Sequence, residues 1–141
     1  MFRNFILISF LFLLSACAGT GTKSIPVSIT KPNNTNDVAL YFSRPSVYVG
    51  GGIIPTIFIN GSEVGKLGSG EYIETIIPKG SFNIELKTQG LNSIGMIGTT
   101  LTGNGSSGSR FFYIVSMRSG LLTSTWVITE TTEQGFKNSQ K

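Results

Sequence analysis

The sequence predicts an all-β protein, a small antiparallel β-sandwich of about seven strands. Two observations lead to this class. Short runs of alternating apolar and polar residues recur from Val38 to Glu130, and residues that favour turns separate them. After residue 16, no stretch of about ten residues has the capped periodicity of an amphipathic helix. The 141 residues are enough for one domain of ordinary size.

The chain begins with the features of a secretion signal. Arg3 precedes a run from Phe5 to Leu14 in which nine of ten residues are apolar. This run is too short for a membrane-spanning helix, which needs about 20 apolar residues. We therefore expect residues 1–16 to be a signal peptide.

The only cysteine of the chain, Cys17, directly follows this run in Leu14-Ser15-Ala16-Cys17. The tetrapeptide resembles the lipobox of bacterial lipoproteins, which implies cleavage before Cys17 and lipidation of its thiol. An alternative is ordinary cleavage at Ala16-Cys17-Ala18, which removes the cysteine with the signal. In lipoproteins of bacteria with two membranes, Ala18 in place of Asp after the cysteine implies sorting to the outer membrane.

The segment after the cysteine has the composition of a linker. Residues 17–37 hold Pro, Thr, Ser and Asn with little alternation, so we expect a lipidated N-terminus followed by a flexible tether. Such a tether averages about 25 Å from end to end. A short edge strand around Val27 and Ile29 is an alternative. The sandwich domain is expected over 38–136, and a polar tail over 137–141.

Residues that end strands or form turns define the first predicted strands. Val38 to Phe42 ends before Pro45, because proline cannot donate a ladder hydrogen bond. Thr56 to Ile59 and Ser62 to Leu67 form a hairpin around Asn60-Gly61, because both turn residues tolerate the positive φ of a type I′ turn. This hairpin is the strongest local prediction.

The remaining strands follow at short intervals. Glu71 to Ile77 leads into Ser81 to Thr88, where apolar and polar residues alternate as in a half-buried strand. Arg110 to Met117 and Thr123 to Glu130 make a final pair around Ser119-Gly120. These runs complete the predicted sandwich.

Gly90 to Ser109 does not fit the strand pattern. It is glycine-rich, and we interpret it as a long flexible connection. The alternative is a mobile loop whose apolar residues contact a partner or the bilayer surface. Its Gly103-Asn104-Gly105-Ser106-Ser107-Gly108 matches the dinucleotide fingerprint but precedes a strand, not a helix, so we expect no nucleotide cofactor.

The composition excludes several classes of function. The chain has no histidine, which removes imidazole bases and ordinary zinc sites, and we expect neither a metal nor a catalytic site. Its net charge of +4 comes from scattered lysines and arginines, so no nucleic-acid partner is expected. A small hydrolase that uses Glu71 and Glu74 is a minor alternative, because paired carboxylates can cleave glycosides.

Three residues are candidate partner contacts. Arg44 lies where the first strand ends, and we mainly expect it to form an internal ion pair with a glutamate. The alternative is that its guanidinium binds a carboxylate or phosphate of a partner. Trp126 is expected in the core, with stacking on a sugar ring as the alternative. Met96 lies in the glycine-rich segment and is the third candidate.

Val38 to about Gly135 resembles a family of small bacterial envelope lipoproteins with a β-rich domain, and in part PEGA-type surface modules. The matching stretches are Ala39 to Pro45, Phe58 to Gly61 with Val64-Gly65, Ile77 to Phe82, and Phe111 to Val115. The resemblance carries over no catalytic residues. It implies a non-enzymatic, periplasm-facing domain that is anchored in the outer membrane and binds or supports another envelope component. A module for peptidoglycan or another glycan is the alternative.

Overall fold

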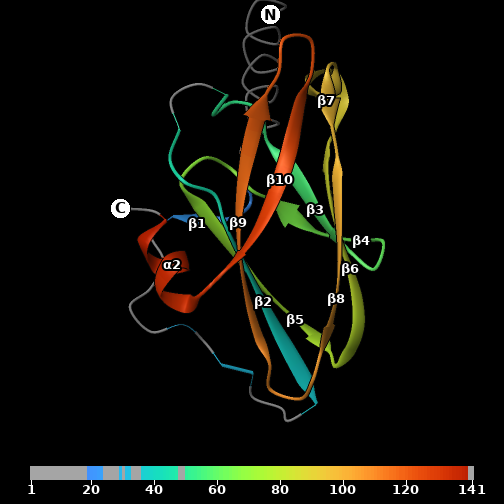
Figure 1. Ribbon diagram of the computed structural model, residues 1–141, viewed down its shortest axis with the longest axis vertical. Helices are drawn as coiled ribbons and strands as arrows, with labels where there is room; N and C mark the ends of the chain where they lie inside the picture. Colours follow the sequence, from blue (N-terminus) through green and yellow to red (C-terminus); the bar gives the residue numbers. More distant parts are fainter. Residues whose placement is uncertain (1–18, 24–28, 30, 33–35, 48–49, 140–141) are drawn as a thin grey trace, which may run out of the picture.

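The computed structural model describes residues 19–23, 29, 31–32, 36–47 and 50–139, and they form an all-β protein (Figure 1). The predicted class is confirmed. Among these residues the strands number ten rather than about seven, and one 3₁₀ helix and one short α-helix accompany them. The elements are β1 Thr22–Lys23, β2 Asp37–Ser43, β3 Pro55–Ile59, β4 Ser62–Lys66, β5 Glu71–Pro78, β6 Gly80–Thr88, η2 Gly90–Ser93, β7 Met96–Ile97, β8 Thr99–Gly105, β9 Arg110–Ser119, β10 Ser124–Thr131 and α2 Glu133–Asn138.

The strands form two sheets packed face to face. One sheet has the order β1-β5-β2-β9-β10-β7, and the other has the order β4-β3-β6-β8. The strand pairing is antiparallel, as expected, except at two places: β2 pairs with β9 in parallel, and β10 pairs with β7 in parallel. A hairpin turn forces neighbours to be antiparallel, but β2 and β9 are far apart in the sequence and no turn constrains them.

The main core lies between the sheets. Alternate residues of β2 point into it, namely Val38, Leu40 and Phe42, and they meet the inward residues of the opposite sheet, such as Ile84. The Phe42 ring stacks on Tyr113 of β9, with 5.4 Å between the ring centroids. Burial on this face explains why the alternation in the sequence was a reliable guide to these strands.

A second apolar cluster covers the outer face of the six-stranded sheet. Tyr41 of β2 stacks on Phe112 of β9 with 4.7 Å between ring centroids, and Phe136 of α2 packs on both. Thr132 caps the helix by accepting a hydrogen bond from the Gly135 amide at 3.1 Å. The boundary expected between a sandwich ending at residue 136 and a polar tail therefore falls inside α2.

The predicted Asn60-Gly61 hairpin is present. Ile59 of β3 pairs with Ser62 of β4, and the two turn residues have φ values of 51° and 81°. The Asn60 side chain also accepts a hydrogen bond from the Asn83 amide at 2.9 Å. This second role fastens the turn to β6.

The glycine-rich segment is not the irregular loop that we expected. It contains η2, β7 and β8, and β8 is a full edge strand on β6. Its glycines allow close packing: a Cβ on Gly103 would overlap the Phe82 ring, and one on Gly105 would lie 2.6 Å from Val38. Glycine in this strand therefore marks close packing and not flexibility.

The expected tether is likewise partly packed. Thr22 and Lys23 form β1 on the edge of β5, and Ile29 is buried in the outer apolar cluster. The alternative edge strand was expected around Val27 and Ile29, four to six residues after the end of β1. Val27 lies outside the described residues.

Candidate functional site

Arg44, a candidate partner contact, is buried in the core. The residue is 2% exposed at the end of β2. Its guanidinium donates hydrogen bonds to the carbonyl oxygens of Ile53 at 2.7 Å, Gly50 at 2.9 Å and Leu67 at 3.3 Å. Burial lowers the pKa of Arg44, and the nearby negative charge of Glu71 opposes this effect.

The internal ion pair expected for Arg44 does not form. Within the described part of the chain, no carboxylate oxygen lies within 4.0 Å of its guanidinium. The guanidinium binds backbone carbonyls instead of a glutamate. Through them Arg44 connects the loop after β2 to the residue after β4. Arg44 therefore acts as a structural clamp.

Trp126 lies in the core, as its main interpretation predicted. Its side chain is 1% exposed, and the indole Nε1 donates a hydrogen bond to the Thr88 hydroxyl at 2.7 Å. The Arg44 guanidinium carbon lies 5.0 Å from the indole centroid. Because the ring is covered, it offers no face for a sugar to stack on.

Met96 is half-buried and packs against the main core from β7. Its backbone pairs with Ser124 of β10. Cys17, the predicted lipidation site, lies outside the described residues. The structure thus brings Arg44 and Trp126 together inside the protein, where both are buried.

Glu71 and Glu74 lie on opposite faces of β5. An odd separation of three residues in a strand places side chains on opposite sides of the sheet. Ile73, next to Glu74, belongs to the main core, whereas the backbone of Glu74 pairs with Tyr41 of the outer cluster. The Glu71 carboxylate accepts hydrogen bonds from the Gly68 amide at 2.8 Å and the Gly21 amide at 3.2 Å. The two carboxylates therefore do not face a common substrate position.

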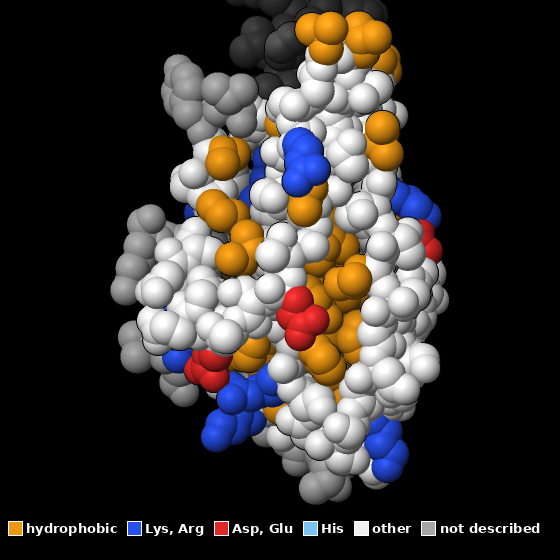
Figure 2. All heavy atoms as spheres, in the orientation of Figure 1, with side chains coloured by type: hydrophobic (Ala, Val, Ile, Leu, Met, Phe, Trp, Pro, Cys, Tyr) orange, Lys and Arg blue, Asp and Glu red, His pale blue; other side chains and the backbone are white. Residues whose placement is uncertain are grey.

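An exposed apolar end combines residues of the glycine-rich segment, which the alternative interpretation assigned to a partner or the bilayer surface, with a hairpin tip that the sequence did not single out. It comprises the tip of the β9–β10 hairpin and the neighbouring segment around η2 and β7. Leu121 is 99% exposed and Leu122 is 89% exposed. Figure 2 shows hydrophobic side chains gathered at this end of the molecule. The residues of this apolar end are Leu91, Ile94, Ile97, Leu121 and Leu122.

The two parts of the apolar end are held together by backbone contacts. The Ser124 amide donates a hydrogen bond to the Gly95 carbonyl at 2.7 Å, and Ile97 pairs with Thr125. A Cβ on Gly95 would lie 3.3 Å from the Leu122 carbonyl oxygen, so the two backbones approach closely. Residues 86–129 contain no Asp or Glu, and Arg118 lies one position before the end of β9. The surface is therefore apolar with a positive margin.

The surface also has hollows. One beside Phe82 and Asn104 has a volume of about 480 Å³, and one beside Thr20 and Ile73 has a volume of about 350 Å³. The one beside Arg44 has a volume of about 190 Å³ and is bounded by Pro45, Val47 and Met117. Sites for small molecules are usually about 300–1,000 Å³, so this hollow is below that range. In the described part of the chain, no three metal-ligating side chains come together.

The described residues include no helix of the length and apolar character required to cross a membrane. No family model matches the chain, and a search of curated proteins found no match for it.

Proposed function

We propose that this chain is a lipoprotein of the bacterial envelope whose β-sandwich binds another envelope protein through its apolar end. Leu91, Ile94, Leu121 and Leu122 are the observation that carries the proposal, because their apolar side chains lie in water at no apparent benefit to the fold. The lipid on Cys17 would hold this surface at the periplasmic face of the outer membrane. We propose no enzymatic activity for the domain.

The buried polar residues have structural roles, which agrees with a binding domain rather than an enzyme. The buried Arg44 and Glu71 both bind backbone groups, which makes them parts of the fold. The chain contains no histidine, and Glu71 and Glu74 lie on opposite faces of a sheet. A two-carboxylate hydrolase needs both groups beside one bond of the substrate.

A protein partner suits the apolar end better than a glycan does. Sugar-binding surfaces present flat aromatic rings with polar groups beside them. The apolar end consists of aliphatic side chains, and Trp126 is buried. Burial of leucine and isoleucine side chains in an apolar pocket of a protein is favourable. It contributes a free energy of about 25 cal/mol for each Å² of apolar surface removed from water.

Crosslinking in living cells tests the binding surface. A photoreactive residue at Leu121 or Leu91 should trap one discrete protein, whereas the same residue at Ser107 should trap none. Ser107 is an exposed control, because it lies in the turn before β9, at the opposite end of that strand from the hairpin tip. Equal crosslinking at all three positions, or capture of lipid alone, would contradict a protein partner. Sedimentation of the protein with cell-wall sacculi would favour the glycan alternative.

Labelling with palmitate tests the anchor separately. The wild-type protein should incorporate the label and fractionate with membranes, and Cys17→Ala should lose both properties. Leu121→Ser is the matched control, because it alters the apolar end and should leave the lipid in place. A Cys17→Ala protein that remains with the membrane would refute lipid anchoring at this residue.

A further inference from the structure

The first described residues of the chain are packed on the sandwich only a few positions after Cys17. The Thr20 amide donates a hydrogen bond to the Lys66 carbonyl at 2.7 Å, and the Thr20 hydroxyl accepts one from the Lys66 amide at 2.8 Å. Thr22 and Lys23 then pair with Tyr72 and Glu71 as β1. The chain is thus joined to β4 of one sheet and to β5 of the other.

Glu71 is the centre of this docking site. Its carboxylate, on a residue that is 7% exposed, accepts hydrogen bonds from the amides of Gly21 and Gly68. The Lys23 ammonium lies 4.0 Å from the same carboxylate and donates a hydrogen bond to the Ser69 carbonyl at 3.1 Å. A buried carboxylate with two amide donors is well compensated, and a docked N-terminal segment supplies one of them.

The glycines of the segment allow the close contact. A Cβ on Gly19 would lie 2.6 Å from the Gly68 nitrogen, and one on Gly21 would lie 2.9 Å from the Tyr72 carbonyl oxygen. Larger residues would push the segment away from the sandwich. Gly19, the first described residue and two positions after Cys17, therefore already contacts the sandwich.

The short link changes what a lipid on Cys17 would do. Successive Cα atoms are about 3.8 Å apart, so the Cys17 and Gly19 Cα atoms are separated by at most about 8 Å. The flexible tether expected from the sequence would average about 25 Å. We infer that lipidated Cys17 holds one side of the sandwich, formed by β1, the end of β4 and the start of β5, directly against the lipid headgroups.

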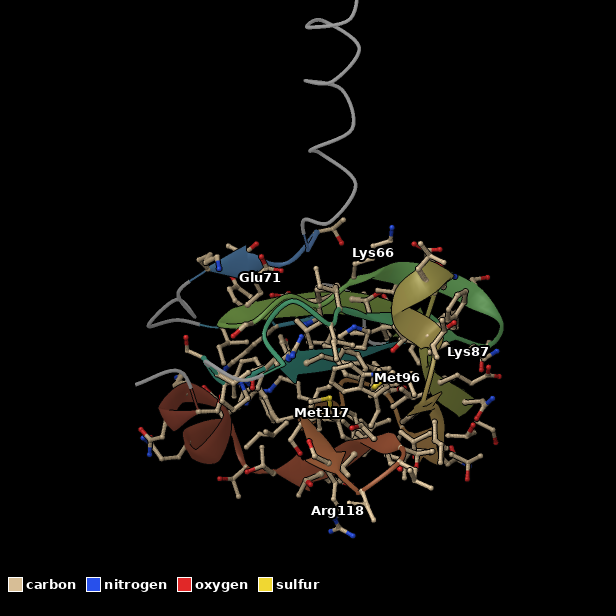
Figure 3. The ribbon with its side chains drawn as sticks, turned by 90° about the horizontal axis from the view of Figure 1, so that it is seen from above. Lys66, Glu71, Lys87, Met96, Met117 and Arg118 are labelled. Carbon is tan, nitrogen blue, oxygen red and sulfur yellow. The ribbon has the colours of Figure 1, made fainter. Side chains whose placement is uncertain are left out.

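The charges of this side suit a bilayer surface with anionic headgroups. Lys23, whose side chain is 72% exposed, and Lys66 both belong to it. Figure 3 places Lys66 and Glu71 on one side of the molecule and Arg118 on the opposite side. The inference rests on the proposed lipidation, and it leaves Arg118, one position before the end of β9, on the side away from the bilayer (Figure 3).

Site-specific cysteine labelling measures this orientation. If the Cys17 thiol carries the lipid, a cysteine introduced elsewhere is the only one that a thiol-reactive fluorophore can modify. We would label Lys66→Cys and Arg118→Cys in the full lipidated protein, reconstituted in vesicles of phosphatidylethanolamine and phosphatidylglycerol. A quencher attached to the lipid headgroups should quench the label at residue 66 severalfold more than the label at residue 118.

A variant with a longer link is the control. Insertion of ten Gly and Ser residues between Ala18 and Gly19 keeps the lipid and the fold but frees the domain to turn, so the two labels should be quenched equally. Equal quenching without the insertion would overturn the inference while leaving lipidation intact. Loss of palmitate labelling at Cys17 would refute the proposed anchor itself, which distinguishes the two failures.

Discussion

The guanidinium of Arg44 lies 5.0 Å from the centre of the Trp126 indole, and both side chains are buried between the sheets. Three carbonyl oxygens accept hydrogen bonds from the guanidinium, and the Thr88 hydroxyl accepts one from the indole. The pair thus joins the end of β2 to β10 and to the loops around them. Arg44 and Trp126 therefore form a polar unit of the core.

Replacing Arg44 by methionine should destabilise the domain by about 3 kcal/mol, because buried carbonyls lose their donor. Urea unfolding of the variant and of the wild type measures this change in the free energy of unfolding. Arg44→Lys should also destabilise, because an ammonium cannot reach all three carbonyls with the geometry of a planar fork. Arg118→Met removes an exposed arginine and should change stability by less than about 0.5 kcal/mol. Equal effects at the two positions would contradict a clamp role for Arg44.

Gly103→Ala should cost about 2 kcal/mol, because its new methyl group would overlap the Phe82 ring. Gly52→Ala is the matched control: a Cβ there meets nothing within 4 Å, and the change should be nearly neutral. Thermal unfolding of both variants tests whether β8 is packed as described. A neutral Gly103→Ala would restore the interpretation of this segment as a flexible connection.

Phe136→Ala should cost about 3 kcal/mol and should loosen α2, because the ring packs on Tyr41 and Phe112. Hydrogen exchange should be faster in α2 and on the outer face of β2, while the main core stays protected. Asn138→Ala changes an exposed residue of the same helix and is the control. Unchanged exchange in Phe136→Ala would mean that the helix contributes little to the outer cluster.

The stability of the domain should fall in alkaline solution between about pH 10 and 12. Burial raises the pKa of Tyr41 and of Tyr113 to about 12, from an ordinary value of 10.0. An acid with a raised folded pKa contributes stability that is fully present below pH 10 and is lost as the pH rises through about 12. Each tyrosine should contribute a slope of about 1.4 kcal/mol per pH unit in this window.

Urea unfolding at several alkaline pH values measures that slope, and tyrosinate absorbance reports the titration itself. Tyr113→Phe should remove one tyrosine's share of the slope while leaving the share of Tyr41. A slope that is unchanged in Tyr113→Phe would show that other groups cause the alkaline loss.

Local pattern was enough to predict most of the strands. Alternation in Ser81 to Thr88 reflects one face in the core and one in solvent, and Asn60-Gly61 carries its turn geometry in two residues. The sequence did not predict β8, because threonine and glycine lack an apolar alternation and its pairing depends on β6. It also did not predict α2, whose six residues are stabilised by Phe136 packing on distant strands.

The candidate site was harder to predict than the strands. The sequence assigned Arg44 a glutamate partner, and the structure gives it three carbonyls, two from the loop after β2 and one from the residue after β4. It treated residues 17–37 as a tether, whereas Thr20 is hydrogen-bonded to Lys66, 46 residues later. In each case the partner is remote along the chain, and no local pattern encodes it.

The sequence by itself determined the all-β class, the turn at Asn60-Gly61 and the absence of histidine chemistry, because each depends on residue type or on spacing over a few positions. Only the tertiary structure decided that Arg44 and Trp126 are buried together, that leucines 121 and 122 are exposed beside Gly95, and that residues 19–23 pack on the sandwich. These features depend on which strands become neighbours. That choice is made by burial of the whole core, where many weak contacts between distant residues act together.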